Sequence, residues 1–280
     1  MRDQILITGG TGKTGSRLAQ QLRERGVGFR VASRSPQGAG SMRFDWRDVT
    51  TFAPTLKDVR AVYLVAPTDT TEPLKAMQPF LETALTAGIE RFVLLSASIL
   101  EADGPMMGQV HGFLKRRAPN WNVLRPTWFM QNFSEGPHHA TICEEGIIYS
   151  ATGQGRVPFI DASDIARVAA TALLDSGFPN GDLVLTGPQA LSYDEVAQTL
   201  LEILGRQIAH CHLSEAELAA RHVQQGLPPN YASVLAAMDT AIAGGAEDRV
   251  TGEVRRTTGR APLNFRSFAT DEREAWEKSA

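Results

Sequence analysis

A short apolar run that stops at a cluster of glycines opens this chain and limits what it can fold into. Ile5-Leu6-Ile7-Thr8 leads directly into Gly9-Gly10-Thr11-Gly12-Lys13-Thr14-Gly15, and apolar residues then recur at helical spacing. This order predicts a strand, a tight loop and a helix whose first turn faces an anion. Glycine lets the backbone approach a phosphate closely, and the start of a helix favours negative charge.

The spacing Gly9-x-x-Gly12-x-x-Gly15 is a variant of the dinucleotide-binding fingerprint. Gly12-Lys13-Thr14 also looks like the end of a Walker loop, but that motif needs a glycine where this chain has Ile7. We therefore exclude a nucleotide triphosphatase. The predicted phosphate contacts are Gly9, Thr11, Gly12, Lys13, Thr14 and Gly15.

The end of the second predicted strand indicates which dinucleotide binds. The strand Phe29–Ser33 runs into Ser33-Arg34-Ser35, and no Asp or Glu occurs from Phe29 to Gln37. A site for NAD carries an acidic residue near this point, whereas arginine suits a 2′-phosphate. The sequence predicts NADP(H), with Ser33, Arg34 and Ser35 as contacts. The alternative is a solvated surface arginine.

Further cofactor contacts are expected where other predicted strands end. Asp45-Trp46 follows Met42–Phe44 and would border the adenine, or would form an aspartate turn beside a half-buried tryptophan. Ala66, Pro67 and Ser96 follow continuous apolar runs of the kind that form buried parallel strands. Ligands of open α/β sheets bind at the carboxyl ends of such strands.

Strands alternate with amphipathic helices through the first half of the chain, which predicts an α/β fold with a doubly wound parallel sheet. We expect an NADP(H)-binding core over residues 1–135. Residues 136–280 form a mixed region that completes the sheet and builds a substrate-binding subdomain. Two capping-box patterns predict helices that begin at Ser192 and Ser214.

Composition excludes several classes of protein. The 280 residues are 42% hydrophobic and 21% charged, with a net charge of −3, which gives no reason to expect nucleic acid or membrane as a partner. No apolar run approaches the roughly 20 residues of a membrane helix. Cys143 and Cys211 lack CxxC spacing, so we expect a reduced, cytoplasmic protein.

We expect no metal site from the histidines. His138-His139 stands near Cys143, but no His-x-x-x-His or CxxC pattern supports a ligand set. His210 and His212 alternate with Cys211 on a predicted strand, where a role in the fold is the simpler interpretation.

A dense aromatic run with two amides follows the strand Asn122–Arg125 and suits the wall of an apolar pocket. Its members are Trp128, Phe129, Gln131, Asn132 and Phe133. Packing between the sheet and the C-terminal part is the alternative. Met107 and Tyr231 complete the predicted substrate-binding set.

Four segments carry a resemblance to a known family: the glycine loop, Ser33-Arg34-Ser35, the segment from Leu124 to Phe133, and Val157–Ile160 running into Asp164-Ile165-Ala166. With them the chain resembles the NmrA-like branch of the atypical short-chain dehydrogenases/reductases. Within it the chain is most similar to the reductases of ergot-alkaloid pathways, of the festuclavine synthase and agroclavine dehydrogenase type. The resemblance spans most of the chain.

This resemblance implies a Rossmann-type domain with a small, discontinuous C-terminal α/β subdomain that closes over the nicotinamide. In ergot-type enzymes NADPH delivers hydride to an imine or iminium carbon. Other members of the branch reduce quinones or carbonyls, and some bind the cofactor only to sense redox state. All three activities remain open here. The partner would be a small molecule, and the protein a monomer or homodimer.

The chain departs from the better-known branch of the superfamily, which uses a serine and Tyr-x-x-x-Lys. None of the four tyrosines has a lysine four residues later, whereas His111 and Lys115 fit that spacing after Ser98. Lys115 would contact the nicotinamide ribose while His111 faces the substrate as a proton donor. Equally, His111 could be a polar helix residue and Lys115 part of a solvated basic run. An iminium carbon needs hydride but no oxygen-directed acid, so this chemistry favours C=N reduction over ketone reduction.

Overall fold

The computed structural model describes residues 3–38, 40–67 and 70–277, which form two compact units. Unit 1 comprises Met1–Pro126, Ala162–Leu185 and Glu253–Arg260. Unit 2 comprises Thr127–Asp161, Thr186–Gly252 and Ala261–Ala280. Each unit is therefore built from three separate segments of the chain.

Unit 1 is built on a seven-stranded sheet with the order β3-β2-β1-β4-β5-β6-β9, in which every pairing is parallel. Its strands are β1 (Gln4–Thr8), β2 (Phe29–Ser33), β3 (Ser41–Arg43), β4 (Val59–Leu64), β5 (Arg91–Leu95), β6 (Asn120–Pro126) and β9 (Gly181–Leu185). The strand order reverses beside β1, so the carboxyl end of β1 lies at the switch point where such sheets bind ligands.

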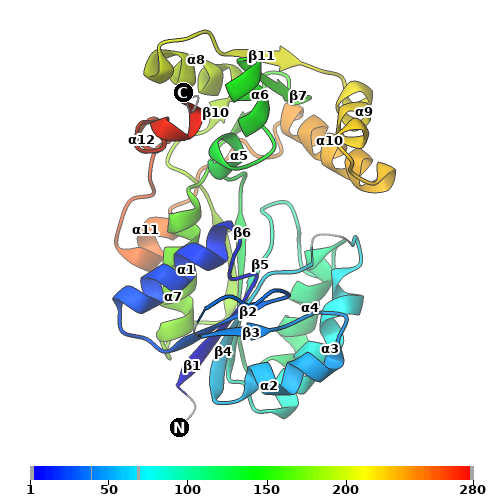
Figure 1. The fold of residues 1–280 in the computed structure, drawn as a ribbon, viewed down its shortest axis with the longest axis vertical. Helices are drawn as coiled ribbons and strands as arrows, with labels where there is room; N and C mark the ends of the chain where they lie inside the picture. The colour runs from blue at the N-terminus through cyan, green and yellow to red at the C-terminus, as the bar shows by residue number, and fades with distance from the viewer. Residues whose placement is uncertain (1–2, 39, 68–69, 278–280) are drawn as a thin grey trace. The chain divides into compact units, whose positions relative to one another are not determined.

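Helices cover both faces of this sheet (Figure 1). One face carries α1 (Lys13–Glu24), α7 (Ala162–Leu174) and α11 (Glu253–Thr258). The other carries α2 (Phe52–Leu56), α3 (Pro73–Thr86) and α4 (Met107–Arg117), and a short 3₁₀ turn, η1 (Val49–Thr51), precedes α2. Helices on both faces bury both sides of the central strands, which explains why β4 and β5 are almost continuously apolar.

Unit 2 contains two small sheets, β8 (Arg156–Val157) with β10 (Leu191–Ser192), and β7 (Ile147–Ser150) with β11 (Ala209–His212). Its helices are α5 (Gln131–Ser134), α6 (His139–Glu144), α8 (Tyr193–Leu204), α9 (Glu215–Gln224), α10 (Pro229–Ala243), α12 (Phe265–Asp271) and the 3₁₀ turn η2 (Arg273–Trp276).

An aromatic core holds unit 2 together. Phe133 packs against Phe159, Tyr193 and Phe265, with ring centroids 5.2 to 5.8 Å apart. The indole N–H of Trp276 donates a hydrogen bond to the carbonyl of Phe133 at 2.8 Å, which fixes the C-terminal turn on this core. Such offset and edge-to-face contacts add to the free energy gained by burying the rings.

The predicted fold class is confirmed, and the predicted capping boxes at Ser192 and Ser214 are both present. The division of the chain differs from the expected break at residue 135. The first segment of unit 1 ends at Pro126, and residues 162–185 and 253–260 return to it. The aromatic run after Pro126 thus belongs to unit 2. Sequence periodicity cannot show such returns, because they depend on which strand edge is free to pair.

β3 ends one residue before the expected Phe44, and β8 has only two residues. β3 ends at Arg43 because Phe44 turns into an aromatic cluster with Trp46 and Phe80. β8 ends at Val157, and Ile160 makes an isolated parallel bridge to Phe129. Among the described residues, no helix has the length and apolar character needed to cross a bilayer.

Asp239 of α10 provides a test of the packing of unit 2. Its side chain is 8% exposed, and it accepts a hydrogen bond from the backbone N–H of Ala151 at 3.0 Å. Burial raises the pKa of Asp239 to about 6, against the lowering effect of that hydrogen bond. A carboxyl whose pKa is raised on folding destabilises the folded state when it ionises, so the folded state loses stability as pH rises through about 6.

We therefore expect Asp239→Asn, which keeps an acceptor and loses the charge, to be more stable than the wild type at pH 8 by up to about 3 kcal/mol. The difference should shrink toward zero as the pH falls to about 4. Urea unfolding at several pH values measures it, with the exposed Asp248→Asn as a control. A stability difference that does not change with pH would contradict the assignment.

Candidate functional site

In the loop between β1 and α1, the backbone at Gly15 packs directly against the backbone at Gly9 and Gly10. Gly9 has a φ of +62°, in the left-handed region that favours glycine. A Cβ on Gly15 would lie 2.3 Å from the carbonyl oxygen of Gly9 and 2.8 Å from the Cα of Gly10. A Cβ on Gly10 would lie 2.5 Å from a methyl carbon of Val31 in β2. These three glycines are therefore required by the shape of the loop.

Buried hydroxyl groups hold the loop in place from below. Thr8 donates to the carbonyl of Tyr63 at 3.1 Å and accepts from the N–H of Val65 at 2.8 Å, which ties the end of β1 to β4. The fully buried hydroxyl of Tyr63 donates to Thr14 at 3.0 Å. Thr14, expected to contact phosphate through its position in the motif, thus has its side chain directed into the core.

The first turn of α1 has free backbone amides that can bind an anion. Gly12 is the N-cap, no side chain caps the helix, and the first turn holds no acidic residue. The N–H of Gly12 donates to Gly9 at 3.0 Å, so the amides of the next three residues are the donors that remain for a ligand. Gly9, Thr11 and Gly12 are exposed, which leaves the loop accessible. The residues fit a dinucleotide pyrophosphate.

Arg34 is exposed beyond the end of β2 and has no hydrogen-bond or ion-pair partner within residues 3–38, 40–67 and 70–277. Ser33 and Ser35 form a local turn beside it, in which the Ser33 hydroxyl accepts from the N–H of Ser35 at 3.2 Å. The turn presents a free guanidinium next to the switch point of the sheet. A 2′-phosphate is a ligand that such a group can bind through charge-assisted hydrogen bonds.

Other predicted cofactor contacts have partial structural roles. Asp45 accepts a hydrogen bond from the N–H of Arg47 at 2.9 Å, and Trp46 is half-buried with its ring edge-on to Phe80. Ala66 and Pro67 are half-buried beyond β4. These placements leave adenine contact by Asp45 and Trp46 as a prediction.

Ser96 stands at the carboxyl end of β5 with a buried hydroxyl that has no hydrogen-bond partner in the described part of the chain. Buried polar atoms are nearly always paired, so an unpaired one calls for an explanation. A cofactor hydroxyl or amide is a group of the kind that would pair with it.

Ser98, the predicted catalytic serine, lies in a charged network. Its carbonyl accepts from Arg125 at 2.7 Å, and Arg125 also pairs with Glu101 and, at 2.5 Å, with Asp182. Burial by itself would lower the pKa of Arg125, but the hydrogen bonds to both carboxylates raise it above its usual value. This network fixes the segment after β5 to β6 and β9.

His111 and Lys115, expected to act together, have different environments. His111 is 2% exposed, its ring lies 5.5 Å from that of Trp121, and its Nδ1 has no hydrogen-bond partner among the described residues. Burial lowers the pKa of His111, so the ring is neutral at pH 7. Lys115 is exposed at the last turn of α4, and Met107 is half-buried at its first residue. This arrangement favours a packing role for His111.

The predicted substrate residues divide into two groups within unit 2. Phe133 is fully buried in the aromatic core, and Gln131 is buried with its amide donating to Asp161 at 2.6 Å. These two build the unit. Trp128, Phe129 and Asn132 are half-buried, as is Tyr231 in the first turn of α10. These four keep surface that a ligand could contact.

Sequence reasoning missed the supporting residues Thr8, Gly10 and Tyr63. Gly10 lies inside the motif, but only its contact with Val31 shows that a side chain is excluded there. Tyr63 reads as an ordinary apolar strand residue, and nothing in its local sequence reveals its bond to Thr14.

A parallel sheet with a switch point, a glycine loop that excludes side chains and an uncapped helix start define a protein that binds a dinucleotide. Comparison with known families matches residues 9–176 to one described as NAD(P)H-binding. The chain belongs to this NAD(P)H-binding family, and its similarity to the NmrA-like reductases is confirmed by its relatives. The prediction of a nicotinamide dinucleotide cofactor is confirmed with it, and the chain is an oxidoreductase dependent on NAD(P)H.

Three similar proteins illustrate the relationship. The chain is 41% identical to an uncharacterized oxidoreductase, YesF, of Bacillus subtilis, over 98% of this chain and 97% of that protein. It is 42% identical to agroclavine dehydrogenase of Claviceps purpurea, over 97% and 98%. A quinone oxidoreductase of Escherichia coli solved with NADPH has the same fold, with a TM-score of 0.81, 22% identity and coverage of 95% and 99%.

The glycine loop yields a direct prediction. Gly15→Ala places a methyl group 2.3 Å from a backbone oxygen that no side-chain rotation can move away. We expect the variant to bind NADPH at least about 10-fold more weakly and to unfold at a lower temperature, because the loop must open to admit the methyl group.

Fluorescence titration with NADPH and thermal unfolding measure both effects. Gly28→Ala is the matched control, since its nearest contact would be a side-chain carbon of Gln4 at 3.8 Å. Unchanged NADPH affinity in Gly15→Ala would show that the loop does not form the phosphate site.

Proposed function

We propose that the protein is an NADPH-dependent reductase whose substrates are imine or iminium compounds of specialised metabolism. The cofactor would lie on the glycine loop, with the first-turn amides of α1 at its pyrophosphate and Arg34 at its 2′-phosphate. When bound, NADPH supplies the hydride. What the chain contributes is binding, orientation and the polarity around the reacting carbon.

One observation carries the choice of substrate class. Tyr63 is the only tyrosine in unit 1, and its hydroxyl is fully buried and bonded to Thr14. Burial raises the pKa of Tyr63, so it is no acid at neutral pH. Reduction of a ketone develops negative charge on oxygen and needs a nearby donor. Reduction of an iminium ion discharges the nitrogen and needs none.

The half-buried aromatic residues of unit 2 agree with a cationic substrate. Trp128 and Phe129 are half-buried aromatic residues, and the face of an aromatic ring attracts a cation through the ring quadrupole. Asn132, in the short helix α5 that follows them, is also half-buried. We propose these three as substrate contacts, with Met107 and Tyr231 as further candidates. The buried, neutral His111 is not required in this scheme.

The relatives support the same substrate class. Agroclavine dehydrogenases of Claviceps and festuclavine synthase I of Penicillium roqueforti are 40 to 42% identical to the chain over nearly its full length. Their names refer to ergot alkaloids, which contain ring nitrogen. We extend only the chemical class, a cyclic amine formed from a C=N precursor, to this protein.

The reaction is tested with NADPH and a panel of cyclic imines, ketones and quinones, followed by NADPH absorbance and product mass. We expect turnover of cyclic imines at least about 10-fold faster than of matched ketones, because the buried Tyr63 is not available as an oxygen-directed donor. Deuteride from labelled NADPH should appear on the former C=N carbon.

Quinone turnover without imine turnover would move the assignment to a quinone reductase. No oxidation of NADPH by any panel member, with cofactor binding intact, would favour a protein that senses the cofactor.

Arg34→Glu tests cofactor preference. The substitution replaces a cation with an anion where the 2′-phosphate is proposed, so NADPH affinity should fall about 10- to 100-fold while NADH affinity changes little. Fluorescence titration with each cofactor measures this. Arg25→Glu, at the opposite end of α1, makes the same charge change as a control. Equal losses for both cofactors would contradict the 2′-phosphate assignment.

A further inference from the structure

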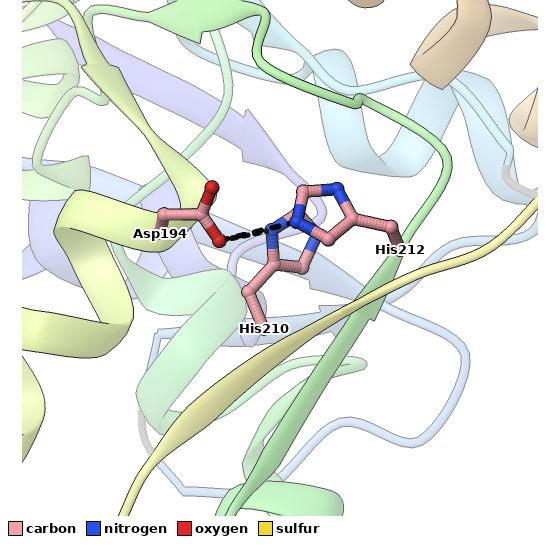
Figure 2. A group of neighbouring side chains, drawn as sticks. All are labelled: Asp194, His210 and His212. Atoms are coloured by element: carbon pink, nitrogen blue, oxygen red, sulfur yellow. Dashed lines mark hydrogen bonds and ion pairs between the residues drawn. The ribbon is translucent and has the colours of Figure 1, made fainter.

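Three side chains of metal-ligating type converge in unit 2, whereas the glycine loop belongs to unit 1. Asp194 lies in the first turn of α8, and His210 and His212 lie two residues apart on β11. Alternate residues of a strand share a face, so both imidazoles point the same way. Figure 2 shows the three side chains directed toward one another, and one ligand atom from each lies within 4.8 Å of the others.

The two histidines approach a single oxygen atom. The Nδ1 of His210 lies 3.0 Å from Oδ1 of Asp194, and the Nε2 of His212 lies 3.3 Å from the same oxygen. In a tetrahedral zinc site with nitrogen and oxygen ligands at about 2.0–2.1 Å, neighbouring ligand atoms are about 3.3 Å apart. The two nitrogen-to-oxygen distances at Asp194 are close to this separation.

Neighbouring residues orient the side chains of Asp194 and His210. Gln154 donates to Oδ2 of Asp194 at 2.9 Å, which leaves Oδ1 facing the histidines. The Nε2 of His210 lies 2.7 Å from the hydroxyl of Ser150, which leaves its Nδ1 facing Asp194. Metal-ligating histidines and carboxylates are typically held in this manner by a second partner.

The elements that carry these ligands are rigid. A capping box at Ser192 and Glu195 fixes the first turn of α8, and β11 pairs in register with β7. The side chain of His210 is fully buried, which holds its ring in one position. His212 and Asp194 keep 45% and 41% of their side chains exposed, which leaves room for solvent to complete the coordination.

A hydrogen-bonded Asp–His pair explains the contact between Asp194 and His210 by itself. The second imidazole lies on the same face of β11, with the two rings 4.1 Å apart, and the carboxylate oxygen has lone pairs for both. A shared divalent cation accounts for all three positions, because it attracts the lone pairs of both rings and the carboxylate to one point.

We propose that Asp194, His210 and His212 bind one Zn²⁺ ion, with water in the remaining position. Bound zinc would join the start of α8 to β11 and so stabilise unit 2. The site does not depend on the proposed reductase activity, and the hydride step does not pass through it.

The test uses full-length protein without a histidine tag, stripped with EDTA and titrated with zinc chloride by calorimetry. We expect one equivalent to bind and the unfolding temperature to rise with zinc concentration, because a ligand that binds only the folded state stabilises it. Cobalt(II) should bind at the same site with a visible absorption spectrum typical of tetrahedral coordination, and magnesium should not compete.

His212→Gln and Asp194→Asn should each weaken zinc binding at least about 10-fold and abolish the cobalt spectrum. His212 is half-exposed, so its variant should unfold at the wild-type temperature in the absence of metal. His222→Gln and Cys143→Ser are the controls, the second because Cys143 lies 3.4 Å from His139 and offers a rival pair of ligands.

Absence of stoichiometric zinc binding by the wild type would overturn the proposal. So would binding that both His212→Gln and Asp194→Asn retain, or binding that is lost in Cys143→Ser while His212→Gln keeps it.

Discussion

The close approach of Gly15 to Gly9 is the contact on which the glycine loop of unit 1 depends. It lets the first turn of α1 begin directly above the end of β1, so that its free amides face the switch point of the sheet. The buried hydroxyls of Thr8 and Tyr63 fix both sides of this loop without projecting into it. The loop can therefore bind an anionic ligand while its own backbone stays fixed. Binding then costs no free energy for rearranging the loop.

Local patterns predicted this part of the molecule well, for a physical reason. The glycine spacing, the apolar strands and the capping residues at Ser192 and Ser214 each act within a few residues of the chain, so their signals are visible in the sequence. The role of Arg34 at a 2′-phosphate stays a prediction. Its position at the end of β2 follows from the strand pattern, and its lack of a partner among the described residues agrees with the expected role.

The sequence did not reveal the contacts that residues make with distant segments of the chain. His111 fits the spacing of a catalytic residue, yet it packs against Trp121, which a helical pattern cannot show. Gln131 and Phe133 look like pocket residues, but Asp161 and the aromatic core occupy them. Likewise His210 and His212 lack any ligand spacing with Asp194, because strand β11 and helix α8 bring them together from 16 or more residues apart. In each case the deciding partner comes from another element.

The returns of the chain to unit 1 have a consequence for its synthesis on the ribosome. β6 ends at Pro126, but its outer neighbour β9 is not made until Gly181–Leu185. Until then the growing chain carries an unpaired edge strand, apolar from Val123 to Leu124 and competent to pair with another chain. Residues 127–161 are made during this interval, before their partners in unit 2, such as Tyr193 and Phe265. The connectivity therefore determines the order in which the two units are completed. A nascent chain released before residue 185 would expose the edge of β6 to other chains.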